Sequence, residues 1–484
     1  RMKVYIYYIY KNVLVDNGII NTDNMDTNDS VYVNWDENES ISLKELLTYA
    51  LTKNWIDMDK LTAEKYSSLQ EAYDSLLEYI SNYISNDTGF GKKVYRYMIS
   101  SGSISGWEVC MMLYEQGVLE PSGSAYEGLS SGRMSAYDFM INAITEKTIT
   151  PAQLALEPCS GSAVVADPDT GELLALVSYP GYDNNRLSGT VDKDYYEQLR
   201  NDKAKPLINK ATSLRTAPGS IFKPCSAITG LEQGVISTGE SIVCTGQYTA
   251  VTPSPKCWIY PRSHGAENVS TAIRDSCNVF FYTVGHRLGM ESGGTYNSTK
   301  GTDLLKNYAE QLGLATKSGV EIYEMDPHPS DRDAVASAIG QGTHAYSAIN
   351  LCRYVSTLAT SGVCHDFTLV SKITDYNGNV IRDNEPVVSN TMNVSSSTWN
   401  AVHQGMRLVI ENTASFKGLP YQAAGKSGTA QENTNKADHI TFISYAPYDN
   451  PEVAVSVLIP NGYASSNAAK LTSDIYKIYW GLDK

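Results

Sequence analysis

Apolar side chains between residues 42 and 149 recur at the three- and four-residue spacing of amphipathic helices. The clearest series are Leu43, Leu46, Leu47, Ala50 and Leu51, then Leu69, Tyr73, Leu76, Leu77 and Ile80, and the segments 107–116 and 136–149. Residues 1–36 differ, because short apolar runs stand among Tyr, Asn and Asp, and this pattern predicts a small β-containing or irregular segment. No internal repeat is evident. We therefore expect a mostly helical N-terminal accessory region over residues 1–130, followed by a second domain over residues 131–484.

A different pattern begins near residue 160. Apolar runs at 163–166 and 172–177 flank the turn sequence 167–171, and this arrangement predicts a β-hairpin. Closer to the C-terminus the pattern predicts strands at 423–431, 440–445 and 453–459 and then a helix at 465–479. Helical and strand-like stretches alternate between these ends, so we expect an α/β fold of the α+β kind.

The composition is that of a folded, acidic protein. Among 484 residues, 38 Lys and Arg stand against 53 Asp and Glu, which gives a net charge of −15. This balance argues against nucleic-acid binding through bulk positive charge. The sequence has no run of about 20 apolar residues that would span a bilayer. Eight cysteines without a Cys-x-x-Cys pair are too few for a disulfide scaffold.

Ser220 and Lys223 are the first candidate for chemistry, because they lie three residues apart at the start of a helix-like run. On a helix this spacing places both side chains on one face, where the amine can accept the hydroxyl proton as Ser220 attacks a carbonyl. Backbone N–H groups at the helix start are available to an oxyanion. Taken alone, the pair more often marks an ordinary first helical turn, because Ser-x-x-Lys arises by chance several times in a chain of this length.

Two further motifs follow along the chain. Ser276-Cys277-Asn278 combines a hydroxyl with an amide, which suits a proton relay or a hydrogen bond to a peptide, although such pairs commonly cap turns. Lys426-Ser427-Gly428-Thr429 lies in the predicted strand 423–431, where glycine permits another backbone to approach closely. Such a strand can pair with a peptide and hold its terminal carboxylate, or it can be a plain edge strand with a solvated lysine.

In this order, the three motifs resemble the Ser-x-x-Lys, Ser-x-Asn and Lys-Thr/Ser-Gly boxes of the penicillin-binding proteins. The flanking segments 161–180, 215–219 and 339–342 are also similar, so that the resemblance covers roughly residues 150–484. Order and flanks look like the class B, monofunctional D,D-transpeptidases of the elongation-type branch. The resemblance implies an antiparallel sheet flanked by helices, preceded by a pedestal region. Cys277 at the variable position and Ser427 in place of the commoner Thr depart from the pattern.

The same resemblance implies roles for the first two boxes. Ser220 would attack the carbonyl between the last two D-alanines of a peptidoglycan stem peptide, and an amine of a second stem would then accept the acyl group. Lys223 would act as general base, kept partly neutral by burial and by the positive charge of Lys426. Ser276 would pass a proton to the leaving amine. Asn278 would hold Lys223 and the substrate backbone.

The third box has implied roles in substrate binding. Backbone N–H groups of Ser220 and Thr429 would form the oxyanion hole, with Gly428 beside them, and the hydroxyls of Ser427 and Thr429 would bind the terminal carboxylate. β-Lactams would acylate Ser220, because they mimic the D-alanyl-D-alanine end.

A candidate metal site lies between the first two boxes. Cys244, Cys257, His264 and Cys277 supply three thiols and an imidazole, which is a common tetrahedral set for structural zinc. Some elongation-type members of the family are similar in carrying a zinc in this interval. The alternatives are small buried residues or a disulfide between Cys244 and Cys257. We interpret the other five cysteines, at 110, 159, 225, 352 and 364, as packing residues.

Several functional alternatives remain at this stage. A serine β-lactamase or a β-lactam sensor carries the same boxes, although a Glu-x-x-Leu-Asn motif that would activate water is absent between the second and third boxes. A carboxypeptidase would use water as the acceptor, and a scaffold for wall-synthesis proteins would use the helical N-terminal region.

The resemblance also implies partners and a location. The expected partners are peptidoglycan stem peptides, β-lactams and a membrane-embedded glycan polymerase, with no nucleic acid. The expected location is the cell membrane, with the catalytic domain outside the cytoplasm. The anchor helix would precede the printed sequence, which begins Arg1-Met2.

Overall fold

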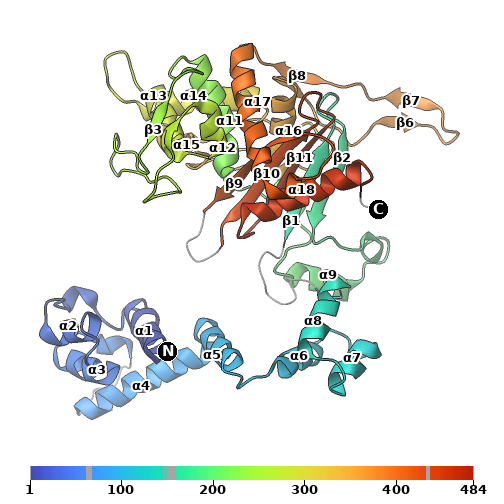
Figure 1. Ribbon diagram of the computed structural model, residues 1–484. Helices are drawn as coiled ribbons and strands as arrows, with labels where there is room; N and C mark the ends of the chain where they lie inside the picture. Colours follow the sequence, from blue (N-terminus) through green and yellow to red (C-terminus); the bar gives the residue numbers. More distant parts are fainter. Residues whose placement is uncertain (1, 62–67, 147, 150–159, 432–436, 483–484) are drawn as a thin grey trace. The chain divides into compact units, whose positions relative to one another are not determined.

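The computed structural model describes residues 2–61, 68–146, 148–149, 160–431 and 437–482 (Figure 1). The chain forms two compact units, Arg1–Ile149 and Thr150–Lys484. None of the helices in the described part of the chain is both long and apolar enough to cross a membrane.

The first unit is helical throughout its regular structure. Its elements are α1 (Met2–Tyr8), the π-helix η1 (Ile9–Val15), the short 3₁₀ turns η2 (Thr22–Asn24) and η3 (Met58–Lys60), α2 (Ser30–Asp36), α3 (Leu43–Thr52), α4 (Leu69–Asn86), α5 (Thr88–Ser100), α6 (Gly106–Glu115), α7 (Gly123–Ser130) and α8 (Ala136–Thr145). The prediction of a β-containing or irregular segment over residues 1–36 is therefore wrong for 2–15 and 30–36, which are helical, whereas 16–29 contain only the short turn η2 and the bridge of Ile20 to Ile56. Tyr10, Val13 and Leu14 are buried on one face of η1, at the three- and four-residue spacing of a helix. In a short segment this spacing is easily mistaken for the alternation of a strand.

Local signals define the helices that the sequence predicts in this unit. Ser42 caps α3, and its hydroxyl accepts the N–H of Glu45 while the Glu45 carboxylate accepts the N–H of Ser42. In α4, Leu76 and Ile80 are buried, as expected of an amphipathic helix.

The second unit combines a central sheet with helices. Its elements are β1 (Gly161–Ala166), β2 (Leu173–Tyr179), η4 (Asn184–Leu187), α9 (Lys193–Asn201), α10 (Lys210–Ser213), η5 (Gly219–Phe222), α11 (Lys223–Glu232), β3 (Ile242–Cys244), β4 (Gly265–Glu267), α12 (Val269–Arg274), α13 (Asn278–Leu288), α14 (Ser298–Gln311), α15 (Ala334–Ser337), α16 (Ala348–Ala359), β5 (Val363–His365), β6 (Lys372–Thr374), β7 (Val380–Asp383), β8 (Val388–Thr391), α17 (Ser396–Glu411), η6 (Ala414–Phe416), β9 (Ala424–Ala430), β10 (His439–Ala446), β11 (Val453–Ile459) and α18 (Ser465–Tyr479).

The central sheet has five antiparallel strands in the order β2-β1-β11-β10-β9. Figure 1 shows α18 lying across one face of this sheet. Both faces are buried, so successive residues of a strand enter different cores: Ile443 packs in the core that contains α11 and α16, and Phe442 packs in the core under α18. The predicted hairpin, the three C-terminal strands and the last helix are confirmed, and β9 is an edge strand.

Three glycines allow the candidate boxes to meet through their backbones. Gly219 donates its N–H to the carbonyl of Gly340 at 3.0 Å, and both residues have a positive φ. A Cβ on Gly340 would overlap the carbonyl oxygen of Gly219. A Cβ on Gly428 would lie 2.6 Å from the carbonyl oxygen of Pro218, so the close approach predicted for this glycine is present.

We expect Gly340→Ala to lower the free energy of unfolding by about 2–4 kcal/mol, because it adds left-handed strain and overlap with the turn that carries Ser220. Chemical denaturation measures the change. The matched control is Gly378→Ala, which has a positive φ but open space around the new Cβ and should cost only about 1 kcal/mol. Equal losses in the two variants would contradict the close-contact explanation.

Candidate active site

Residues from all three boxes line one cavity of about 730 Å³. Ser220 comes from the 3₁₀ turn η5, Ser276 and Asn278 from the start of α13, and Ser427 and Thr429 from β9. More than fifty residues separate each box from the next along the chain, so only the tertiary fold brings them together.

Lys223 is completely buried at the first position of α11. Its ammonium group donates to the backbone carbonyl of Ser276 at 2.7 Å, to Oγ of Ser276 at 3.0 Å and to Oδ1 of Asn278 at 2.7 Å. A buried amine needs such partners, because desolvation is otherwise very costly. The second box therefore supplies the polar environment for the lysine of the first.

Ser276 links the two lysines of the site. Its Oγ also lies 3.1 Å from Nζ of Lys426, which donates in addition to the carbonyl of Ser427 at 3.0 Å. Ser276 has a φ of 53°, a left-handed conformation that is uncommon for serine. This backbone turn directs its hydroxyl and its carbonyl toward the buried lysines.

Burial controls the protonation of these lysines. It lowers the pKa of Lys223 to about 7, against a smaller opposing effect of the nearby Cys277 and Cys257 thiols. The pKa of Lys426, which is 1% exposed, is also lowered, first by burial and then by the charge of Lys223. Burial is thus the main cause of the neutral amine predicted for Lys223.

Strand β9 forms one wall of the cavity. Ser427 is half-buried and pairs with Phe442, whereas Thr429 is exposed and pairs with Ile440. Because β9 is paired only with β10, its other edge is available for strand addition by a peptide.

Several lining residues were not singled out from the sequence. Arg274 and Asp275 form an ion pair of 2.6 Å at the cavity, and the indole N–H of Trp258 donates to the carbonyl of Asp275 at 3.1 Å. Gln341 also lines the cavity. The sequence offered one signal for this ion pair, because Arg274 and Asp275 directly precede Ser276. Adjacent residues of opposite charge are nevertheless too common to indicate a site.

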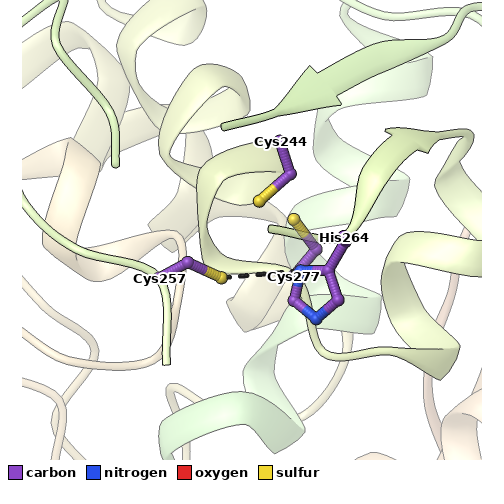
Figure 2. Close-up of side chains that lie close together, drawn as sticks. All are labelled: Cys244, Cys257, His264 and Cys277. Carbon is purple, nitrogen blue, oxygen red and sulfur yellow. Dashed lines mark hydrogen bonds between the residues drawn. The ribbon is translucent and has the colours of Figure 1, made fainter. Parts of the chain in front are cut away.

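Cys244, Cys257, His264 and Cys277 form a second cluster (Figure 2). Their candidate ligand atoms all lie within 4.8 Å of one another, and the three cysteines are buried free thiols. Nδ1 of His264 faces Sγ of Cys257 at 3.7 Å. Two backbone N–H groups donate to the sulfurs. The N–H of Asn278 lies 3.3 Å from Sγ of Cys257, and the N–H of Phe280 lies 3.5 Å from Sγ of Cys277. This donor set can hold a metal ion.

The thiols of Cys257 and Cys277 influence each other. The hydrogen bond from Cys277 lowers the pKa of Cys257, and the same interaction together with burial raises the pKa of Cys277. In the described part of the chain, four further cysteines are buried free thiols: Cys110, Cys225, Cys352 and Cys364. Cys159, also interpreted as a packing residue, lies outside the described residues.

Comparison with known proteins places this geometry in a family. Residues 161–477 match the model of the penicillin binding protein transpeptidase domain. The chain belongs to this family. Its transpeptidase fold, with a five-stranded antiparallel sheet flanked by helices, is the one that the three boxes implied.

Two relatives illustrate the sequence similarity. The peptidoglycan D,D-transpeptidase MrdA of Haemophilus influenzae is 29% identical over 362 residues, which cover 67% of this chain and 53% of that protein. The peptidoglycan D,D-transpeptidase PbpA of Mycolicibacterium smegmatis is 29% identical over 332 residues, which cover 63% of this chain and 62% of that protein. The chain spans about half the length of the MrdA relatives.

Solved structures show the same fold. PBP2 of Pseudomonas aeruginosa in complex with WCK 5153 is similar with a TM-score of 0.58 and 26% identity, over 67% of this chain and 71% of that one. A peptidoglycan synthase complex that coordinates polymerization and crosslinking is similar with a TM-score of 0.59 and 26% identity, over 67% of this chain and 56% of that one.

Proposed function

We propose that the protein is a peptidoglycan D,D-transpeptidase of class B, elongation-type branch, which crosslinks stem peptides through an acyl-enzyme on Ser220 and is acylated there by β-lactams. One observation carries this proposal: Lys223, Ser276, Asn278 and Lys426 form a continuous hydrogen-bonded set beside the cavity that Ser220 lines.

In the first step, Oγ of Ser220 attacks the carbonyl carbon between the two terminal D-alanines. Lys223 accepts the hydroxyl proton, a role supported by its lowered pKa and its position three residues along the same turn. The proton then passes to the nitrogen of the departing D-alanine through Ser276, whose Oγ lies within 3.1 Å of both lysine amines. An amine of a second stem peptide finally attacks the ester carbonyl and releases Ser220.

The donor peptide pairs with the open edge of β9 in this proposal. Backbone N–H groups of Ser220 and Thr429 stabilise the oxyanion, and Gly428 lets these two segments approach each other. The hydroxyls of Ser427 and Thr429 bind the terminal carboxylate, with the charge of Lys426 behind them. Asn278 holds the amine of Lys223 and the substrate backbone.

A fluorescent penicillin should label the purified protein covalently. Ser220→Ala should abolish the label, because alanine lacks the hydroxyl oxygen on which the penicilloyl ester forms. Gel fluorescence after denaturation measures this. Ser237→Ala, an exposed serine beyond the end of α11, is the matched control and should label normally. Undiminished labelling of Ser220→Ala would refute the assignment, and rapid release of the label by hydrolysis would identify a β-lactamase instead.

The rate of penicillin acylation should rise with pH, reach half of its maximum near pH 7 and level off above about pH 8, since only the neutral amine of Lys223 accepts the proton. Stopped-flow measurement of the acylation rate against pH tests this. In Asn278→Asp the midpoint should move to higher pH, because a carboxylate 2.7 Å from the amine favours the ammonium form. A rate that is independent of pH between about 6 and 8 would contradict the role of Lys223.

We further propose that the Cys/His cluster binds a structural zinc ion through Cys244, Cys257, His264 and Cys277. The residues fit this ion: the donor set is three thiols and an imidazole, the two N–H···S hydrogen bonds support thiolates, and Nδ1 of His264 faces Sγ of Cys257. A closed four-ligand site leaves no position for substrate. Cys277 lies between Ser276 and Asn278, so the ion would hold the loop that carries the second box.

Protein purified without chelators should contain about one zinc per chain. Cys244→Ser should lose the metal and slow penicillin acylation, because the second box is then less ordered. Cys110→Ser, a buried free cysteine in the helical unit, should keep the metal. Elemental analysis and acylation rates test this. A metal content that is equally low in the unmodified protein would count against the site.

The remaining assignments concern partners, location and domains. We propose that the second unit, Thr150–Lys484, is the catalytic domain and that the first unit, Arg1–Ile149, is a pedestal; the boundary expected at residues 130 and 131 would separate α8 from the helices it packs on. The catalytic domain would lie outside the cytoplasm at the cell membrane, beside a glycan polymerase. The similarity to a synthase complex that coordinates polymerization and crosslinking supports such a partner.

A further inference from the structure

The helical unit contains a 30-residue repeat that the sequence analysis missed. Helices α6 and α8 both have ten residues, and their bounds differ by 30 at each end. The residues that connect them to the preceding helices are also related by 30: Ser100, Ser101, Gly102 and Ser105 correspond to Ser130, Ser131, Gly132 and Ser135. Only a few identical residues mark the repeat, and they are small and polar, so that apolar periodicity does not reveal it.

Backbone hydrogen bonds confirm the correspondence. The N–H of Ile104 donates to the carbonyl of Met98, and the N–H of Met134 donates to that of Gly128. The hydrogen bond from the N–H of Val109 to the carbonyl of Ser105 recurs between Phe139 and Ser135. The bond from the N–H of Val118 to the carbonyl of Leu113 recurs between Thr148 and Ala143. Both glycines of the turn have a positive φ, 75° at Gly102 and 71° at Gly132. Each repeat is therefore a helical hairpin, α5–α6 followed by α7–α8.

The second hairpin covers one face of the first. The indole N–H of Trp107 on α6 donates to the carbonyl of Leu129 on α7 at 2.8 Å. The rings of Tyr114 on α6 and Tyr126 on α7 meet edge to face, with centroids 4.9 Å apart. Leu129 itself is fully buried. Stacked repeats of this kind stabilise one another through such nearest-neighbour contacts.

Within the described residues of the first unit, no helix covers the equivalent face of α8. Tyr137, Ile141 and Ile144 correspond to Trp107, Met111 and Tyr114, and they are 75%, 45% and 52% exposed. Their spacing of four and three residues places them on one helix face. The corresponding residues of the first repeat are covered only in part, because Trp107 is 43% exposed whereas Met111 and Tyr114 are half-buried. The back of the second repeat is thus an apolar surface of the kind that the first repeat partly covers.

At the other end, α5 exposes the face that α7 buries. Ile99 corresponds to the buried Leu129 but is 48% exposed, and Tyr95 on the same side is 60% exposed. Phe90 and Tyr97 on the opposite side of α5 pack on Tyr5 of α1. The exposed side of α5 is therefore not the one that attaches it to the rest of the unit.

Charge also distinguishes these two surfaces. Helix α5 carries Lys92, Lys93 and Arg96 and no acidic residue, whereas α8 carries Asp138 and no basic residue. Arg96 corresponds to Tyr126, the residue that contacts Tyr114, and Tyr114 corresponds to Ile144 in the last turn of α8. If α5 packs on α8 as α7 packs on α6, Arg96 therefore lies at the C-terminus of α8, where the helix macrodipole favours a cation.

We propose that the exposed face of α8 binds α5 of a second copy of this chain, and that this contact continues the stacking between the two repeats. Ile144 of one copy then lies against Arg96 of the next, as Tyr114 lies against Tyr126 within the chain. Tyr137 correspondingly lies against the last turn of α5, near Ile99. The interface joins different surfaces of the two copies, so repeated association gives an open row of molecules rather than a closed dimer.

Disulfide trapping tests the register of this contact. One sample of the full chain carries Arg96→Cys and another carries Ile144→Cys, and the two are mixed under mild oxidation. A heterodimer linked between the two introduced cysteines is expected on a non-reducing gel, with the crosslink located by mass spectrometry. Asn142→Cys, an exposed position on the other side of α8, is the matched control and should link at a rate at least about tenfold lower. Equal crosslinking at Asn142 and Ile144 would overturn the proposed register.

Sedimentation of the unmodified chain tests the association itself. The weight-average mass should rise with protein concentration. The double variant Ile141→Asp, Ile144→Asp should weaken self-association about tenfold or more, because burial would desolvate unpaired carboxylates. Both positions are exposed, so the variant should keep its helical circular dichroism and its penicillin labelling. A monomer at all concentrations would overturn the proposal, as would association that the double variant leaves unchanged. Binding of a different protein to the exposed face of α8 in place of a second copy would also overturn it.

Discussion

A completely buried lysine amine is the constraint on which the rest of the second unit depends. Water cannot solvate Lys223, so the protein must supply its hydrogen bonds, and all three recorded acceptors come from Ser276 and Asn278. This requirement joins the first box to the second. The same desolvation lowers the pKa of Lys223 to about 7, so that burial both organises the site and prepares the amine to accept a proton.

The other features of the site maintain this arrangement. Close backbone contacts at Gly219, Gly340 and Gly428 let the turn before α11 lie directly on β9. The left-handed backbone at Ser276 presents both of its oxygens to the lysine. Behind it, the Cys/His cluster surrounds Cys277, and the N–H of Asn278 donates to Cys257. The second box is thus also held by residues of this cluster.

The helical unit follows a different physical logic. Its second half is built from two stacked hairpins, each of which has too little apolar surface to form a core by itself. Leu129 is buried and the rings of Tyr114 and Tyr126 meet between the hairpins, but a stack of two necessarily leaves one face open at each end. The open faces on α5 and α8 are a consequence of the repeat number, and they differ in charge because the two hairpins have diverged.

The sequence by itself predicted the elements whose signals are local. The hairpin at 163–177, the strands near the C-terminus, the amphipathic helices after residue 42 and each box taken singly depend on neighbours within about a dozen residues. The segments 2–15 and 30–36 were predicted wrongly, because a few apolar residues in a short window do not distinguish a strand period from a helix period. The 30-residue repeat was missed for a related reason, since its identical residues form turns and do not contribute to an apolar pattern.

Only the tertiary structure decided which residues meet. The amine of Lys223, the hydroxyl of Ser276 and the amine of Lys426 come from distant parts of the chain, and their mutual distances depend on how the sheet and helices pack. The ion pair of Arg274 and Asp275 joined the cavity in the same way. Burial, and therefore the pKa of Lys223, is a property of the whole core around that residue. A sequence motif names the groups that can react, but the packed fold determines their separation and their exclusion from water.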